Sequence, residues 1–185
     1  MLLLKTKIKR KRSPMTLIDE LQIIGKDSAP HSGKTIYLAA GWFNPIQEKL
    51  LKEAYAALLH NQTVAHVHVP LLHQYEGSNP IVNGEFNPDQ EWATATFDDD
   101  VSAIDNADVV VALLDASDQD TGTIWEMGYA YASHKPVVVL AVGDTFQYPI
   151  NLMPAQGAIH HLANNNLETF DFYEINKRFY VGKTI

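Results

Sequence analysis

Residues 108–114, Asp-Val-Val-Val-Ala-Leu-Leu, form a nearly unbroken apolar run in the second half of the 185-residue chain. A strand with one face in water alternates polar and apolar residues, whereas this run is typical of a central parallel strand that is covered on both faces. Residues 34–40 (KTIYLAA) and 136–142 (PVVVLAV) have the same character, and residues 64–69 (VAHVHV) predict a fourth strand.

Helical patterns separate these strands. Apolar residues recur with helical spacing over residues 45–59, 91–106 and 121–133, a weaker pattern begins near Leu152, and residues 74–88 predict a long loop. The alternation predicts an α/β fold, a single doubly wound parallel sheet of the flavodoxin or Rossmann-like type with helices on both faces. Such sheets bind ligands beyond the carboxyl ends of their strands, so we look for chemistry in the loops there.

Composition excludes several classes of protein. The chain length favours one domain, and the absence of cysteine excludes disulfides, thiolate metal sites and cysteine nucleophiles. A chain without cysteine fits a reducing compartment, so we expect a cytoplasmic protein. No apolar run approaches the length of a membrane span, and the first residues lack the pattern of a secretory signal.

Charge is unevenly distributed, with a net value of −8. Six of the 14 basic residues stand in the first 14 positions, whereas from Met15 onward eight basic residues oppose 22 acidic ones. An acidic body disfavours nucleic acid as a partner. We predict an N-terminal extension over residues 1–33, basic and poorly ordered at its start, followed by one domain over residues 34–185. The basic run fits a solvated tail better than a nucleic-acid or nuclear-import patch.

The first predicted strand ends in Gly41-Trp42-Phe43. This sequence has neither the glycine spacing of a dinucleotide-binding loop nor the lysine of an ATP-binding loop, so we predict no cofactor. The two aromatic residues suit an aromatic ring as ligand, and ordinary packing at a strand end explains them equally well.

Three acidic residues stand out. Glu126 lies in an apolar helical stretch between Trp125 and Met127, where an unpartnered carboxylate is costly, although an exposed glutamate on the outer face of the helix is the simpler alternative. Asp120 lies in the loop before this helix, and Asp100 is the third of three consecutive aspartates on the preceding helix. Two or three carboxylates that converge on one cleft suit glycosidic chemistry, in which one attacks the anomeric carbon and another transfers a proton.

Histidines offer no recognisable metal-binding spacing. His66 and His68 share a strand face, and His160 and His161 are adjacent. A metal site needs a third ligand at suitable geometry, so we interpret these histidines as structural and predict no metal.

The chain resembles the nucleoside 2-deoxyribosyltransferases of lactic-acid bacteria. The resemblance extends from about Lys34 to Met153, with a weaker echo at residues 170–173, and identifies residues 34–185 as a catalytic domain. The segments that carry it are residues 36–43, 69–71, 74–77, 92–96, Asp100, Asp120 with Gly122, residues 126–130 and residues 149–153.

The resemblance implies an enzyme that transfers 2-deoxyribose between nucleobases with retention at the anomeric carbon, in nucleoside salvage. Glu126 would be the nucleophile that forms a covalent deoxyribosyl-enzyme, Tyr37 would orient it, and Asp100 would handle the proton of the base. Substrate-binding residues would be Asp120 at the sugar hydroxyl, Gln74, Trp42 and Phe43 at the base, and Asn151 with Met153 at the 5′-hydroxyl from a neighbouring subunit. The predicted partners are therefore deoxynucleosides, free nucleobases and further copies of the chain, since the family is typically hexameric.

Three differences from the family pattern stand out. Ala39 replaces a usual glycine near Tyr37, and residues 123–125 (Thr-Ile-Trp) replace a smaller, glycine-containing stretch before the glutamate. The family ends in a tyrosine whose carboxylate closes on the site, whereas this chain continues past Tyr173 to Ile185.

Two other functions remain as alternatives. A deoxynucleoside 5′-monophosphate N-glycosidase would use water as acceptor, but the acidic loop over residues 115–120 would repel a phosphate dianion. A non-catalytic nucleoside-binding module on the same fold would bind without turnover.

Overall fold

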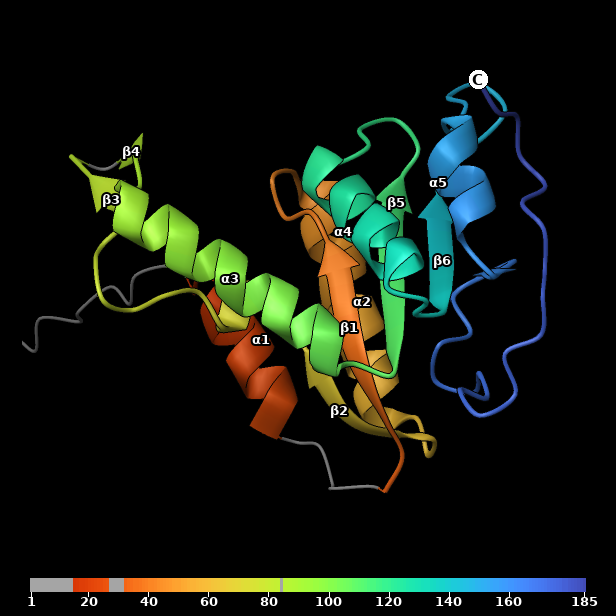
Figure 1. Cartoon of the computed structure of the whole chain (residues 1–185), viewed down its shortest axis with the longest axis horizontal. Helices are drawn as coiled ribbons and strands as arrows, with labels where there is room; N and C mark the ends of the chain where they lie inside the picture. Colours follow the sequence, from red (N-terminus) through yellow and green to blue (C-terminus); the bar gives the residue numbers. More distant parts are fainter. Residues whose placement is uncertain (1–14, 27–31, 84) are drawn as a thin grey trace, which may run out of the picture.

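The computed structural model of the chain describes residues 15–26, 32–83 and 85–185. The predicted basic start of the chain lies outside these residues. Five parallel strands form the central sheet in the order β2-β1-β5-β6-β7. This arrangement, with helices on both faces, confirms the predicted α/β class (Figure 1).

The four long strands and the helices after residues 45, 90, 121 and 152 lie close to their predicted positions. The strands are β1 (Lys34–Ala40), β2 (Val64–His68), β5 (Val109–Asp115), β6 (Val137–Val142) and β7 (His160–His161). The helices are α1 (Leu17–Lys26), α2 (Pro45–His60), α3 (Gln90–Asn106), α4 (Thr121–Ala132) and α5 (Leu152–Gly157), with a short 3-10 turn η1 at Pro70–Leu72. The predicted long loop contains a small antiparallel hairpin, β3 (Ile81–Val82) with β4 (Glu85–Phe86).

Alternate residues of the apolar strands enter two separate cores. In β1, Ile36 and Leu38 pack with α2, whereas Tyr37 and Ala39 pack on the opposite face, which α3 and α4 cover. This alternation follows from strand geometry, in which successive side chains point to opposite faces of the sheet. It directs the Tyr37 side chain toward α4.

The strand order reverses beside β1. From β1 the chain first crosses to β2 on one side, and the remaining strands then add on the other side, beginning with β5. The crevice between the carboxyl ends of β1 and β5 is thus the topological switch point, where sheets of this kind bind ligands. The loop after β1 carries Trp42 and Phe43, and the loop after β5 carries Asp120 and leads into α4, which carries Glu126.

Helix α1 packs on the domain. Its first turn is capped by Thr16 and Asp19, whose side chains accept hydrogen bonds from each other's backbone N–H. Leu21 is fully buried in the same core as α2, and Lys52 of α2 pairs with Glu20. Part of the predicted N-terminal extension is therefore in contact with the hydrophobic core.

No helix in the described part of the chain is long and apolar enough to cross a membrane.

Replacing Leu21 by Ala tests whether α1 stabilises the domain. We expect the free energy of unfolding in urea to fall by about 2–5 kcal/mol, because the change leaves a cavity in a closed core. The matched control is Ile23→Ala on the same helix, where the side chain is 49% exposed and the expected change is below about 0.5 kcal/mol. Equal stability of the two variants would contradict a structural role for α1.

Candidate active site

A short hydrogen bond joins the sheet to α4. The hydroxyl of Tyr37 donates to Oε1 of Glu126 at 2.6 Å, across 89 positions of sequence. Tyr37 is fully buried in the middle of β1, and Glu126 is partly buried on the second turn of α4. Among the described residues, no hydrogen bond reaches the second carboxyl oxygen, Oε2. The side chain predicted to orient Glu126 therefore contacts it and leaves one oxygen available.

Asp120 is fixed at the start of α4. Its Oδ2 accepts hydrogen bonds from the backbone N–H and the hydroxyl of Thr123, both at 2.7 Å, so it serves as the N-cap of the helix. Gly41 lies against it, since a Cβ atom at Gly41 would come within 3.0 Å of the Asp120 Cβ. Glycine at the end of β1 thus lets this strand end approach the loop after β5 closely.

Asp100 on α3 completes a cluster of three acids. The negative charges of Asp100 and Asp120 both act on Glu126, and Asp100 also acts on Tyr37. Burial raises the pKa of Glu126 to about 8, and the two aspartates add to this rise, whereas the hydrogen bond from Tyr37 opposes it. The structure therefore brings together the three acids that the sequence predicted to share one cleft.

The neighbours of Glu126 also have shifted proton affinities. Burial, with a contribution from the charge of Asp99, raises the pKa of Asp100 to about 6. Burial and the charges of Glu126 and Asp100 raise the pKa of the Tyr37 hydroxyl, which therefore remains a hydrogen-bond donor. Near neutral pH the carboxyl pair of Asp100 and Glu126 thus retains about one proton, which is the condition for proton transfer at this site.

The predicted base-binding residues surround the same end of the sheet. The rings of Trp42 and Phe43 lie 5.3 Å apart, with Phe43 70% exposed and Trp42 partly packed against the core. Gln74 follows η1 in a loop that is held to α3, since the backbone N–H of Tyr75 donates to Thr96 at 3.2 Å. Packing against the core therefore accounts for part of the Trp42 side chain, whereas the ring of Phe43 is exposed to solvent and available to a ligand.

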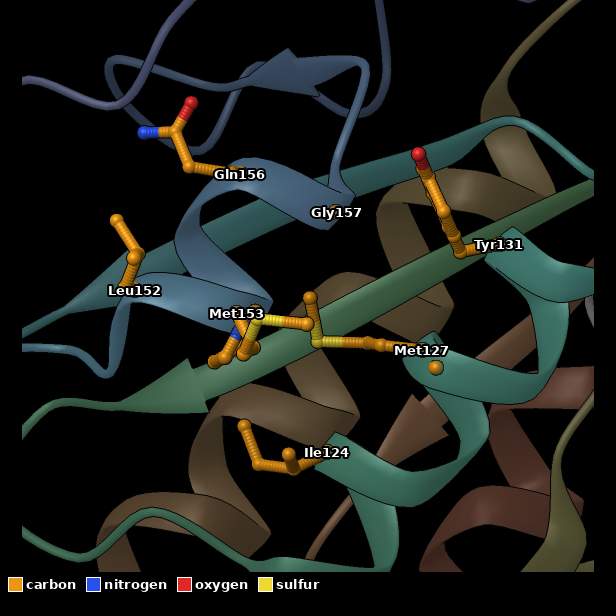
Figure 2. A pocket seen from close by; sticks show the side chains of 9 residues that line it. Ile124, Met127, Tyr131, Leu152, Met153, Gln156 and Gly157 are labelled. Atoms are coloured by element: carbon orange, nitrogen blue, oxygen red, sulfur yellow. The ribbon is translucent and has the colours of Figure 1, made fainter.

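Asn151 and Met153 lie on a different side of α4. Asn151 caps α5 by accepting from the N–H of Met153, and Met153 is 76% exposed. Met153 borders an apolar groove of about 360 Å³ between α4 and α5, which Figure 2 shows together with Ile124 and Tyr131. These two α4 residues lie about 140–160° around the helix from Glu126. Within one chain, Met153 and Glu126 therefore occupy separate surroundings.

A stack of histidines lies beside Tyr37, and the sequence did not reveal it. His68 is the partner of Tyr37 in the pairing of β1 with β2, and the two rings stack at 5.4 Å. His73 stacks on the other side of His68 at 4.2 Å. Burial, with the charges of His73 and His66, lowers the pKa of His68 to about 4, so its ring is neutral at neutral pH. Strand register, which the sequence does not fix, is what places His68 next to the site.

Within the described residues, no group of three or more His, Cys, Asp or Glu side chains could hold a metal ion.

Comparison with known proteins agrees with this geometry. The sequence profile of the family described as nucleoside 2-deoxyribosyltransferase matches residues 36–153. The chain belongs to this family. Its match to the nucleoside deoxyribosyltransferase of Lactobacillus leichmannii is 34% identical over 151 residues, covering 80% of this chain and 96% of that one. The enzyme of the same name from Limosilactobacillus fermentum is 36% identical over 157 residues, covering 82% and 92%.

Solved structures support the same assignment. The 2-deoxyribosyltransferase from Bacillus psychrosaccharolyticus superimposes with a TM-score of 0.65 at 30% identity, covering 80% of this chain and 99% of that one. The predicted family, the predicted fold and the predicted enzyme class are therefore confirmed. The span matched by the family profile contains every residue predicted for the site, from Tyr37 to Met153.

The buried charge of Glu126 makes a prediction about stability. The pKa of Glu126 is about 8 in the folded protein, against an ordinary value of 4.5, so the folded state binds the proton more tightly than the unfolded state does. The free energy of unfolding therefore decreases as the pH rises from about 4.5 to about 8. We expect Glu126→Gln to raise the melting temperature at pH 8, and the gain to shrink toward zero at pH 4.5. Scanning calorimetry at both pH values measures this. The control is Glu53→Gln on α2, which removes one negative charge from an exposed position. If the change in melting temperature caused by Glu126→Gln were the same at both pH values, the surroundings would not disfavour the charged form of the Glu126 carboxyl.

Proposed function

We propose that the chain transfers 2-deoxyribose from one nucleobase to another through a covalent ester on Glu126, with retention at the anomeric carbon. The hydrogen bond from Tyr37 to Glu126 beside two further acids carries this proposal. It holds one carboxyl oxygen in place and leaves the other to react. Membership of the deoxyribosyltransferase family supports the substrate class.

In the first half of the reaction, Oε2 of Glu126 attacks C1′ on the face opposite the base. The bond between C1′ and the base nitrogen breaks, and its electron pair leaves with the base. Near neutral pH the one proton of the carboxyl pair lies mainly on Glu126, whose pKa is the higher of the two. The reaction proceeds from the minor form in which Glu126 is ionised and Asp100 carries the proton, which Asp100 gives to the departing base. The negative charge of Asp120 and Glu126 stabilises the positive charge that develops on the sugar.

The second half reverses these steps with a different base. A nitrogen of the incoming base attacks C1′, the ester bond to Glu126 breaks, and Asp100 accepts the proton that the base loses. Each attack inverts the configuration, so two attacks retain it. The ester must survive until the second base arrives, and burial of Tyr37 and the partial burial of Glu126 support a site that is poor in water.

Substrate contacts follow from the same scheme. Asp120 would hold the sugar hydroxyl through Oδ1, since Oδ2 is engaged by Thr123. Trp42, Phe43 and Gln74 would contact the base.

The 5′-hydroxyl would be bound by a second copy of the chain, through Asn151 with Met153. These residues are exposed and lie away from Glu126 within one chain, which supports a site completed by a neighbouring subunit in a homo-oligomer. The groove beside them has room for a neighbour, because a Cβ atom at Gly128 would meet nothing within 4 Å. We place the reaction in the cytoplasm, in agreement with a chain that has no cysteine.

The hydrolysis of 5′-monophosphates is less well supported. Asp118 accepts a hydrogen bond from Asn44 at 2.8 Å, which holds the acidic loop at the end of β1. A phosphate near this loop would be repelled by the charges of Asp118 and Asp120, at a cost in binding energy.

Incubation of the protein with deoxyinosine and adenine tests the proposal. We expect deoxyadenosine to form, and mass spectrometry after incubation with deoxyinosine alone to find a deoxyribosyl adduct on the peptide that contains Glu126. Glu126→Ala should abolish both the exchange and the adduct. The control is Glu53→Ala on the exposed side of α2, which should exchange bases at the rate of the unaltered protein.

Two results would reject the proposal. Release of base and deoxyribose phosphate from a deoxynucleoside monophosphate, without base exchange, would favour the N-glycosidase. Nucleoside binding without turnover, equally strong in Glu126→Ala, would favour a binding module.

The dependence of kcat/KM on pH tests the role of Tyr37. With pKa values of about 6 and about 8 on the two carboxyls, we expect a bell-shaped profile between these limits. Tyr37→Phe removes a hydrogen bond that stabilises the Glu126 carboxylate, so the pKa of Glu126 rises. The upper limb should move to higher pH, and the maximum should fall roughly 10- to 100-fold, since a hydrogen bond to a charged group contributes about 1.5–3 kcal/mol. An unchanged upper limb would show that Tyr37 does not act on Glu126 in the working enzyme.

A further inference from the structure

The position of Asp100 depends on a helix with few anchors of its own. Helix α3 has only two buried side chains along its 17 residues, Trp92 and Ile104. In Figure 1 its first half projects beyond the sheet toward the β3–β4 hairpin. The position of Asp100 relative to Glu126 therefore depends on the side-chain contacts between α3 and α4.

Aromatic rings make this connection. The ring of Phe97 on α3 lies 5.3 Å from the ring of Trp125 on α4, and Trp125 stacks on Tyr129 at 5.4 Å with an angle of 6° between the planes. Phe97 precedes Asp100 by three residues and lies on the same side of α3, whereas Trp125 is the residue before Glu126, about 100° away around α4. The contact therefore joins α3 and α4 at the level of the two carboxyls. We call the contacts of Phe97, Trp125 and Tyr129 the α3–α4 seam.

Polar contacts continue the seam toward the end of α3. The hydroxyl of Tyr129 donates to Oδ1 of Asp105 at 3.0 Å. Lys135, which follows α4, donates to the backbone oxygens of Asp105 and Ala107, the latter at 2.7 Å. The C-terminal end of α3 is therefore tied by hydrogen bonds, and the part that carries Asp100 contacts α4 through Trp125 and the loop after η1 through the hydrogen bond of Tyr75 to Thr96.

We propose that Trp125 is a positioning residue that, held between Phe97 and Tyr129, sets the distance between the Asp100 and Glu126 carboxyls. This inference rests on the proposed function, in which Asp100 transfers the proton of the base. Trp125 acts through Asp100, so its loss should slow the proton transfer and leave substrate binding little changed. A displacement of about 1 Å at a reacting group lowers a rate on the order of 100-fold.

A double-mutant cycle between Trp125 and Asp100 tests the proposal. We expect Trp125→Ala to lower kcat by roughly 10- to 100-fold with KM changed little. In the Asp100→Asn background, Trp125→Ala should lower kcat by no more than about twofold. The asparagine has no proton to transfer, so its distance from Glu126 no longer affects the rate. Trp125→Phe keeps an aromatic ring and should recover most of the rate. Phe97→Ala removes the contact from the other helix and should reproduce the pattern, even if Trp125→Ala folds poorly.

A second measurement does not depend on turnover. Burial holds the pKa of Asp100 at about 6, and we expect it to fall toward its ordinary value in Trp125→Ala as α3 moves away, as followed by NMR titration of the carboxyl carbon. An unchanged Asp100 titration would overturn the positioning role. So would a rise in KM at constant kcat, or an effect of equal size in the Asp100→Asn background, because both would indicate that Trp125 touches the substrate. If the titration moves as expected but the unaltered protein exchanges no bases, the positioning role stands and the proposed function fails.

Discussion

The fold is organised around a carboxyl group that is expensive to bury. Burial and the charges of Asp100 and Asp120 disfavour the charged form of Glu126. Within the described residues, the only hydrogen bond that stabilises this form comes from Tyr37. A free carboxylate in water would need no such help, but it would also be a weak nucleophile surrounded by solvent. In the proposed mechanism, partial burial with a single fixed donor leaves one oxygen of Glu126 free to attack, and the raised pKa is the cost of that arrangement.

The sheet supplies this donor through two simple constraints. Alternation along β1 decides that Tyr37, rather than Ile36 or Leu38, faces α4. The reversal of strand order beside β1 then opens a crevice between β1 and β5, and the loop after β5 delivers Asp120 and α4 into it. Gly41 lets the end of β1 approach this loop closely, because a Cβ atom there would come within 2.8 Å of Gln47 Oε1 and 3.0 Å of the Asp120 Cβ. Apolar strands, one glycine and one helix cap are thus sufficient to assemble groups that lie far apart in the sequence.

Much of this could be predicted from the sequence, and the failures have physical causes. The four long strands and the helices over residues 45–60, 90–106 and 121–132 follow from continuous apolar runs and helical periodicity. β7, with two residues, and the β3–β4 hairpin depend on pairing with distant or irregular segments, which leaves no periodic signal. Asp120 and Glu126 were expected at one edge because the segment after β5 lies at the carboxyl ends of parallel strands. Asp100, in the middle of α3, was added to them from the chemistry of paired carboxylates and from the family resemblance. The stack of His68 on Tyr37 was not predicted, because it depends on the register of β2 against β1.

Helix α4 shows how one short element can serve two purposes. Its 12 residues include only three that are buried, Thr123, Met127 and Ala130, which is few for a helix with so many apolar side chains. One flank, with Trp125 and Tyr129, meets α3 beside the acids, and the opposite flank lines the groove next to Met153. A helix that only covered the sheet would be polar on both flanks. The apolar character of both flanks fits the two proposals made for this helix. One flank would position Asp100 against Glu126 within the chain, and the other would contact a neighbouring chain.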